Sequence, residues 1–216
     1  MSIDEKKVSC HEPRIPLLSA DEMSPAQRQI YDQVVSGPRG QMIGPLRAAI
    51  HSPELAALWS EFGEFIRYRT CLPPRLNELA ILVTARRWTS QVEWWVHARA
   101  CAAAGMPETM IDAIGAKRAP VFTEEADLEV YEFARSLQQM GQVGQETYNA
   151  IQRRWGTRGV VELTAVIGYY TMVSITLNAH RLPLPEGIDE LPLESDLVIL
   201  PPGRLGAASS VAAAQS

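Results

Sequence analysis

The stretch PPRLNELAILVTARRWTSQVEWWVHARACAAAG, residues 73–105, decides the fold. After its paired prolines, apolar residues recur at the spacing of one helix face, at Leu76, Leu79, Ala80, Val83 and Trp88. A short break at Thr89-Ser90 precedes a second helix, predicted over residues 91–104 and ended by Gly105. The stretch therefore predicts two consecutive helices, which form a hairpin if the break at Thr89-Ser90 folds the second back on the first.

On the amino-terminal side, residues 1–20 show little periodicity and predict an extended arm. Ser24 is a good helix cap and Pro25 suits the first helical position, so a helix is expected to begin there. Gly37-Pro38-Arg39-Gly40 ends that helix, and Ser52-Pro53 starts another. The apolar face of the latter comprises Leu55, Leu58, Phe62 and Phe65. These helices form an amino-terminal extension to the hairpin.

On the carboxyl-terminal side, Met106-Pro107 opens a helix, and residues 124–140 and 145–155 predict two more. A turn is expected over Gly156 to Gly159, followed by a long apolar helix from Val160 to Ala179. No stretch alternates as a half-buried strand would, so the fold class is all-α. We expect one helical domain over residues 21–185, followed by a proline-rich segment and flexible tail over 186–216.

Composition excludes several classes of protein. The 216 residues carry a net charge of −5 and no basic run, which is a poor match for binding nucleic acid. Charges in residues 1–10 stand where a signal peptide would need an apolar core. The longest apolar stretches look too short and too polar for a membrane span. We therefore expect a cytoplasmic protein with no membrane partner.

The three cysteines, Cys10, Cys71 and Cys101, are widely spaced and form no CxxC. An odd number without such a pair argues against a disulfide framework. We expect them to be buried small apolar residues rather than reactive thiols.

The candidate chemistry lies at Glu78, Glu93 and His97. Glu93 and His97 are four residues apart and share one face of a helix. A carboxylate beside an imidazole sets its tautomer and raises its basicity, which suits acid–base catalysis near neutral pH. If the hairpin closes, Glu78 faces the pair and completes a proton relay. The indoles of Trp88, Trp94 and Trp95 are candidate walls that would shield it from water.

Other interpretations of these residues stay open. Ser90 and Glu93 form a capping-box pattern, in which Glu93 would only satisfy a helix end. His97 would then be an ordinary core histidine. Glu78, Glu93 and His97 could supply three metal ligands, but no HExxH and no Cys/His cluster accompanies them. We expect neither a metal nor a cofactor.

A faint internal repeat accompanies the hairpin. Asn77-Glu78-Leu79-Ala80 is echoed by Val161-Glu162-Leu163-Thr164, and each glutamate precedes a histidine, His97 or His180, by a similar interval. Two related helical hairpins would produce this pattern, and so would chance.

Three segments together resemble the carboxymuconolactone decarboxylase and alkylhydroperoxidase-D-like (AhpD-like) superfamily. They are Arg75-Leu76-Asn77-Glu78-Leu79-Ala80-Ile81-Leu82, Glu93-Trp94-Trp95-Val96-His97 and Ala103-Ala104-Gly105-Met106. The resemblance covers roughly residues 40–185. It implies an AhpD-like bundle of helical hairpins that assembles into trimers or hexamers, with a site at Glu78, Glu93 and His97.

The peroxidase branch of that superfamily carries a CxxC whose second cysteine stands four residues before the histidine. Ser90 and Glu93 occupy those two positions here, so a thiol peroxidase activity is not expected. The carboxylate is a feature of the decarboxylase branch. The resemblance therefore implies a cofactor-independent lyase or isomerase acting on a small carboxylated or lactone-like substrate.

In that reaction His97 is the expected acid–base group, Glu93 its orienting partner and Glu78 a relay for the proton. Substrate contacts are expected from the three arginines of the first helix and a neighbouring indole: Arg75, Arg86, Arg87 and Trp94. The alternative is a non-enzymatic protein that kept the fold for binding a small ligand or for assembly.

The long helix from Val160 to Ala179 predicts self-association. Its apolar residues, among them Ile167 and Val173, fall all around the helix, so every side must be covered. A second subunit would cover what the chain itself leaves open, and we expect a homo-oligomer. The alternative is that this helix is the centre of a monomeric bundle.

Overall fold

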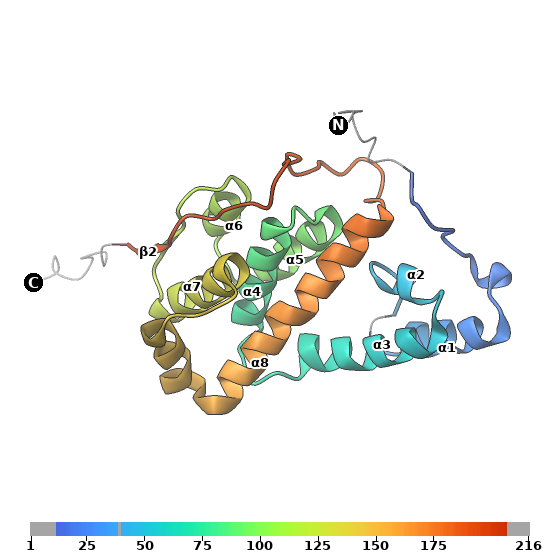
Figure 1. The fold of residues 1–216 in the computed structure, drawn as a ribbon, viewed down its shortest axis with the longest axis horizontal. Coiled ribbons are helices and arrows are strands. Elements are labelled where there is room, and N and C mark those ends of the chain that lie inside the picture. Colours follow the sequence, from blue (N-terminus) through green and yellow to red (C-terminus); the bar gives the residue numbers. More distant parts are fainter. Residues whose placement is uncertain (1–11, 39, 207–216) are drawn as a thin grey trace, which may run out of the picture.

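The computed structural model describes residues 12–38 and 40–206, which form eight α-helices and one two-stranded sheet (Figure 1). The helices are α1 (Pro25–Ser36), α2 (Leu46–Ala49), α3 (Pro53–Tyr68), α4 (Pro74–Arg87), α5 (Gln91–Ala103), α6 (Glu108–Gly115), α7 (Glu125–Met140) and α8 (Gln145–His180). A short 3-10 helix, Ala20–Glu22, precedes α1, and the strands are β1 (Val121–Phe122) and β2 (Arg204–Leu205). The predicted all-α class is confirmed.

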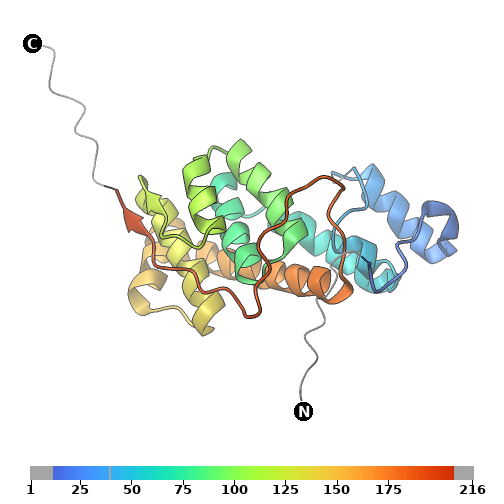
Figure 2. The same cartoon turned by 90° about the horizontal axis from the view of Figure 1, so that it is seen from above.

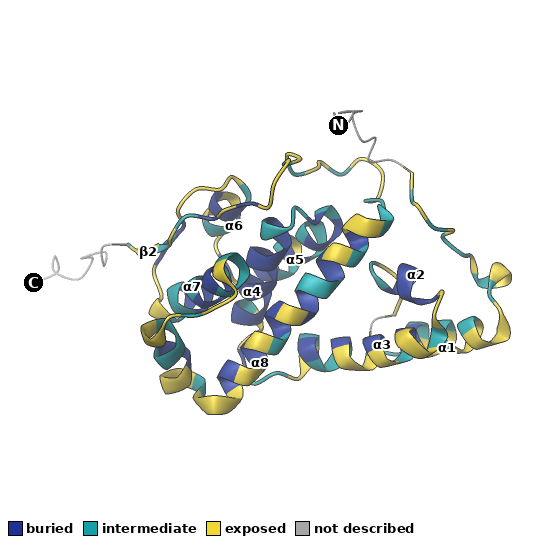
Figure 3. Cartoon of the chain, in the orientation of Figure 1, coloured by how far each residue is buried: buried dark blue, intermediate teal, exposed yellow. Residues whose placement is uncertain are grey.

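Helix α4 is the centre of the molecule. Every residue from Leu76 to Arg86 is buried, because α5, α7 and α8 all pack against it (Figure 3). At the end of α4 the backbone of Thr89 enters the left-handed region, with φ of 45°, and the chain reverses into α5. The hairpin predicted from residues 73–105 is therefore present, and its first helix is covered by other helices on all sides.

Helix α8 is sharply bent where a turn was predicted. Only Gly156 leaves helical geometry, with φ of 66° and ψ of −172°, and the helix resumes immediately after it. The expected turn over Gly156 to Gly159 is thus a single-residue kink. This backbone conformation is open almost only to glycine, since a Cβ would clash with the main chain.

The Gly156→Ala substitution is expected to lower the free energy of unfolding by about 1–3 kcal/mol, the strain of a side chain in this conformation. Gly168→Ala is the matched control, because its Cβ would point into open space within a regular stretch of the same helix. That change should raise stability by up to about 1 kcal/mol through helix propensity. Urea unfolding followed by circular dichroism measures both, and equal effects would contradict the assignment of the kink.

Most of the apolar surface of α8 is covered by its own chain. Ile167 and Val173, expected at an interface, are only 2% and 1% exposed, whereas Val161 and Ile175 remain exposed. By length and composition α8 also qualifies as a membrane span, contrary to the expectation from the sequence. However, 56% of its apolar window is buried inside the protein, and no other helix among the described residues qualifies.

The amino-terminal extension, α1 to α3, leans away from the body of the molecule (Figures 1 and 2). The predicted start of α1 is confirmed, since the Ser24 hydroxyl accepts a hydrogen bond from the Gln27 backbone N–H. Residues 12–19 contain no helix or strand, and the segment lies against the carboxyl-terminal end of α8 at Arg14. There the Arg14 backbone and side chain donate hydrogen bonds to the His180 and Ala179 carbonyls, at 2.9 and 3.0 Å.

Beyond α8, residues 182–206 cross the helical body as a long extended segment, here called the strap (Figure 2). Side chains of α4, α5 and α7 hydrogen-bond its backbone from Leu191 onward: Arg87, Gln91, Tyr131, Glu132 and Gln139. It ends as β2, which pairs in parallel with β1. The end of the predicted flexible tail, residues 207–216, lies outside the described residues, and so do residues 1–11 of the predicted arm, including Cys10.

Candidate functional site

Glu78, Glu93 and His97 meet between α4 and α5, and together they form what we call the triad. Glu78 Oε2 lies 2.5 Å from His97 Nδ1, and Glu93 Oε2 lies 3.0 Å from His97 Nε2. All three residues are buried. The imidazole is therefore held between two carboxylates, one at each ring nitrogen, because the hairpin brings Glu78 alongside the helix face that Glu93 and His97 share.

The capping-box interpretation of Glu93 and convergence of the three side chains on a metal do not match this geometry. Ser90 makes no side-chain capping bond and its hydroxyl has no partner, so Glu93 belongs to no capping box. The two carboxylates also approach opposite nitrogens of His97, and hence the three side chains do not converge on one point as metal ligands would.

The triad carries an unusual charge balance. Burial acts to lower the pKa of His97, but the negative charges of Glu78 and Glu93 outweigh it and raise the pKa to about 9, from 6.5. At neutral pH the ring is therefore a buried imidazolium. The ring of Tyr170 packs edge-on against it, with centroids 4.9 Å apart, and helps to exclude water from the site.

His97 is expected to titrate near pH 9 in an NMR titration of its ring signals. Because its pKa is raised on folding, the triad stabilises the fold fully below about pH 6.5, and this contribution is lost as the pH rises through about 9. In Glu78→Gln one negative charge is removed and the hydrogen bond to His97 is weakened, so the pKa of His97 should fall. A wild-type midpoint at or below about 6.5 would contradict the charged triad.

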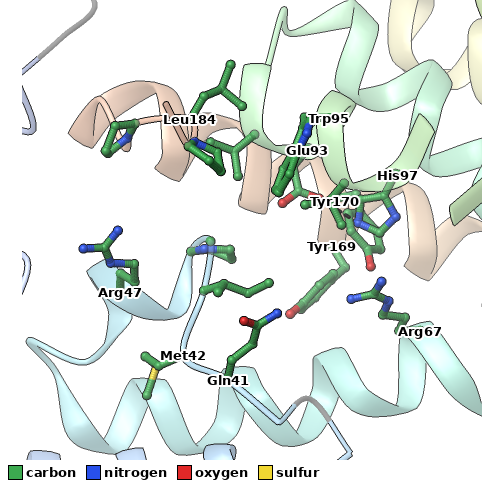
Figure 4. Close-up of a pocket in the computed structure, with 17 residues that line it drawn as sticks. Gln41, Met42, Arg47, Arg67, Glu93, Trp95, His97, Tyr169, Tyr170 and Leu184 are labelled. Atoms are coloured by element: carbon green, nitrogen blue, oxygen red, sulfur yellow. Dashed lines mark ion pairs between the residues drawn. The ribbon is translucent and has the colours of Figure 1, made fainter. Parts of the chain in front are cut away.

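A cavity of about 340 Å³, here called cavity 1, opens beside the triad (Figure 4). Glu93 and His97 line it, whereas Glu78 stands behind the imidazole and does not. Its other walls come from several parts of the chain: residues 41–45 before α2, Arg47 of α2, Arg67 of α3, Val92, Trp95 and Val96 of α5, Tyr169 and Tyr170 of α8, and residues 183–185 of the strap. This size and mostly apolar lining suit a small organic molecule.

Two arginines in cavity 1, Arg47 and Arg67, were not among the residues predicted from sequence. Arg67 extends from α3 toward the tyrosines, and Arg47 stands at the opposite side of the cavity (Figure 4). Among the described residues, neither forms an ion pair with a carboxylate; Arg67 lies over the ring of Tyr68. Unpaired cations facing a cavity are suited to binding an anionic group of a ligand.

Solved structures of known proteins share this architecture. The AhpD core of an uncharacterized peroxidase-related protein from Ralstonia eutropha JMP134 superposes with a TM-score of 0.66 and 11% identity, over 81% of this chain and 93% of that one. This chain has the AhpD-like fold. At such low identity the likeness concerns the fold alone. No protein-family model matches the sequence, and a search of curated proteins finds no significant match.

Two further structures agree on the AhpD-like fold. A variant of the debrominase Bmp8, in complex with 2,3,4-tribromopyrrole, has a TM-score of 0.64 and 13% identity, covering 80% of this chain and 91% of its own. A putative antioxidant defence protein AhpD from Agrobacterium tumefaciens, ATU0492, of unknown function, has a TM-score of 0.55 and 14% identity, covering 64% and 95%. The predicted fold is thus shown, and the predicted decarboxylase branch stays a proposal.

The structure does not bring the three predicted substrate arginines to cavity 1. Arg75 pairs with Asp127 at 3.0 Å. Arg86 is fully buried and binds the Gly115 carbonyl and Glu194. Arg87 donates hydrogen bonds to backbone carbonyls of the strap. In the AhpD-like fold of this chain these cations therefore hold helices and strap together.

The predicted tryptophan walls divide between the cavity and the core. Trp95 lines cavity 1, whereas the Trp94 indole packs on Gly115 of α6. Trp88 donates its indole N–H to the Gln138 side chain at 3.0 Å and does not line cavity 1. Successive side chains on a helix point about 100° apart, so only one of the adjacent indoles on α5 reaches the site.

The two described cysteines are unsuited to nucleophilic chemistry. Cys101 is fully buried, and burial together with the negative charge of Glu78 raises the pKa of its thiol to about 12. Burial and the neighbouring Glu162 also raise the pKa of Cys71. Neither cysteine lines cavity 1, so the described part of the site contains no thiolate.

The predicted second Glu–His pair has no counterpart of the triad. Glu162 and His180 lie on one helix, α8, about 27 Å apart at the rise of a regular helix. Glu162 instead binds the Cys71 backbone N–H and the Arg158 side chain. The sequence echo therefore carries no second site.

Proposed function

We propose that this chain is a cofactor-independent lyase or isomerase that transfers a proton at carbon in a small carboxylated or lactone-like substrate. The observation that carries this proposal is the buried triad of Glu78, Glu93 and His97 at the wall of a cavity that also holds unpaired arginines. A strongly perturbed titratable group in such a cavity is typical of a catalytic site.

Glu93 is the proposed substrate-facing group, because Glu78 stands behind the ring and both nitrogens of His97 face carboxylates. In an isomerisation, Glu93 takes a proton from a carbon next to a carbonyl, and the electron pair moves onto the carbonyl oxygen. In a decarboxylation, the bond to the carboxylate carbon breaks instead, carbon dioxide leaves, and an enolate likewise forms. Arg67 would balance the negative charge of either enolate.

The enolate must then be protonated on carbon. After proton abstraction in an isomerisation, Glu93 already carries the proton, exchanges it with solvent and returns it to a substrate carbon. After a decarboxylation, the imidazolium of His97 passes its Nε2 proton to Glu93, which delivers it to the substrate carbon. Glu78 holds the ring in place through Nδ1 and favours its charged form, so that a proton is available at neutral pH. In the decarboxylation His97 then regains a proton from solvent, which replaces the one delivered to carbon, and the site returns to its starting state.

Incubation with small lactone acids, 2-oxo acids and 3-oxo acids in deuterium oxide tests the proposal. Proton NMR should detect deuterium at a substrate carbon, and ultraviolet absorbance should follow any loss of an enol or lactone. The complex of the debrominase Bmp8 with tribromopyrrole supports such a panel, because it places a small organic molecule in a protein of this fold. Ligand binding without exchange would instead favour the non-enzymatic alternative.

We also propose that the protein forms a homo-oligomer through α3 and the adjoining part of α8. Leu55, Leu58 and Phe62 are 47%, 67% and 47% exposed, and they line one groove together with Met172 of α8. Such a continuous apolar face is unusual on a monomer. Because Ile167 and Val173 are buried in their own subunit, charges at those positions would test folding and not association.

Light scattering coupled to gel filtration is expected to give a multiple of 23.9 kDa for the wild type. Leu58→Glu should reduce that mass, because a buried unpaired charge at an interface is strongly unfavourable. Leu197→Glu is the matched control on the strap, away from α3, and should not change it. A wild-type mass of 23.9 kDa would contradict self-association.

A further inference from the structure

A second cavity adjoins cavity 1 on the other side of the strap. This space, here called cavity 2, has a volume of about 330 Å³. Val92, Pro183 and Leu184 line both cavities, so they form the partition between them. The triad stands on the cavity 1 side, and the remaining apolar walls of cavity 2 are Trp88, Leu177, Leu182 and Leu193.

The partition includes the least restrained part of the strap. From Leu191 onward the strap backbone is held by side chains of the body, and Leu182 hydrogen-bonds the end of α8. Among the described residues, the segment 183–190 between these anchors makes no hydrogen bond, and Gly187 adopts a φ of 78°. Leu184 is therefore carried by a short span that can shift without breaking an anchor.

The two cavities differ in charge. Cavity 1 holds Arg47 and Arg67 without carboxylate partners, next to the triad. Cavity 2 holds Arg14 and Arg181 together with Glu190 and Glu194, and Glu194 is already paired with Arg86 and Lys117. A single carboxylate is thus better placed in cavity 1, while the apolar walls of cavity 2 suit an uncharged chain.

We propose that cavities 1 and 2 form one elongated site for an aliphatic monocarboxylate, whose unbranched tail passes the Leu184 partition into cavity 2. The assignment rests on the proposed function, since it places the carboxylate end beside Arg67 and Glu93. It adds a substrate class, an amphiphilic acid, and names Leu184 as the residue that the tail must displace.

Isothermal titration of the full chain with butanoate, hexanoate, octanoate and decanoate tests this assignment. Each added methylene that is buried should lower Kd about fourfold, and the gain should continue through decanoate. Leu193→Glu places a charge in the wall of cavity 2 at a position that is 61% exposed, so the fold tolerates it. It should leave butanoate binding unchanged and abolish the gain for the two longest acids.

Leu197→Glu serves as the control, since it carries the same change on the strap but lines neither cavity. It should reproduce the wild-type series. Arg67→Gln should raise Kd by about tenfold or more for all four acids, because each loses the same charged contact. The inference is overturned if the gain ends at the same chain length in wild type and Leu193→Glu, or if no acid binds.

Binding and exchange are separate readouts, so the two proposals can fail independently. If Kd falls with chain length as predicted but no substrate shows deuterium exchange, the proposed function alone is overturned. If deuterium exchange requires Glu93 but Kd stops falling once the acid fills cavity 1, the elongated site alone is overturned.

Discussion

Replacing His97 with Leu is expected to lower the free energy of unfolding by about 3–5 kcal/mol near pH 8. The substitution replaces the imidazole with an apolar side chain of similar size and so removes the positive charge between Glu78 and Glu93. Two buried carboxylates then face each other without a counter-charge, and their desolvation is no longer offset. Urea unfolding followed by circular dichroism measures the loss.

Acid pH provides the internal control for this variant. Near about pH 4 free carboxyl groups begin to bind protons, so the uncompensated charge in His97→Leu can be neutralised. The stability gap between wild type and variant should therefore narrow sharply between pH 8 and pH 4. An equal gap at both pH values would indicate lost packing instead, and no gap at pH 8 would mean that the triad carries no buried charge.

Glu93→Gln is expected to lower the rate of deuterium exchange on an active substrate by about 10²–10⁴-fold, the usual contribution of an acid–base group. The amide has nearly the same shape but cannot take up a proton from carbon. Steady-state exchange rates measured by NMR should show the loss in kcat, since the amide still fills its place in the cavity wall.

Glu146→Gln, an exposed glutamate in the first turn of α8, is the matched control and should retain the wild-type rate. Glu78→Gln should be intermediate, because Glu78 acts through His97 without touching the substrate. A Glu93→Gln protein as active as the control would remove Glu93 from the mechanism.

Local signals were sufficient to predict the hairpin and the triad. The prolines before α4, the break at Thr89-Ser90 and Gly105 after α5 mark the ends of the two helices, and they depend only on neighbouring residues. The four-residue spacing of Glu93 and His97 sets their common face. Once the hairpin closes, Glu78 on α4 faces α5 and lies beside the imidazole of His97.

The arginines show what local sequence cannot reveal. Arg75 and Arg86 lie on α4, the helix that carries Glu78. Their side chains nevertheless form ion pairs with Asp127 and Glu194, which are distant in sequence, and do not reach cavity 1. Arg67 lies on a helix without any motif and reaches cavity 1 only because α3 packs below α8. Which cation faces a ligand thus depends on tertiary partners, and these cannot be read from spacing.

The strap was likewise beyond the sequence argument. Its proline-rich composition predicts an irregular segment but not its path. That path is set by single hydrogen bonds from the helical body, such as Gln91 to Leu191 and Tyr131 to Pro201. Because these partners are far apart in the chain, the contribution of Leu184 to both cavities emerges only in three dimensions.

The central proposal is that the carboxylates and imidazole of the triad, and no thiol, carry out the chemistry of this chain. The most direct measurement is deuterium incorporation at the substrate carbon by a protein in which Cys10, Cys71 and Cys101 are all replaced by Ala. We predict that this cysteine-free protein exchanges at the wild-type rate, because the described thiols lie outside cavity 1 and are held protonated. Loss of exchange in a folded cysteine-free protein would contradict the account.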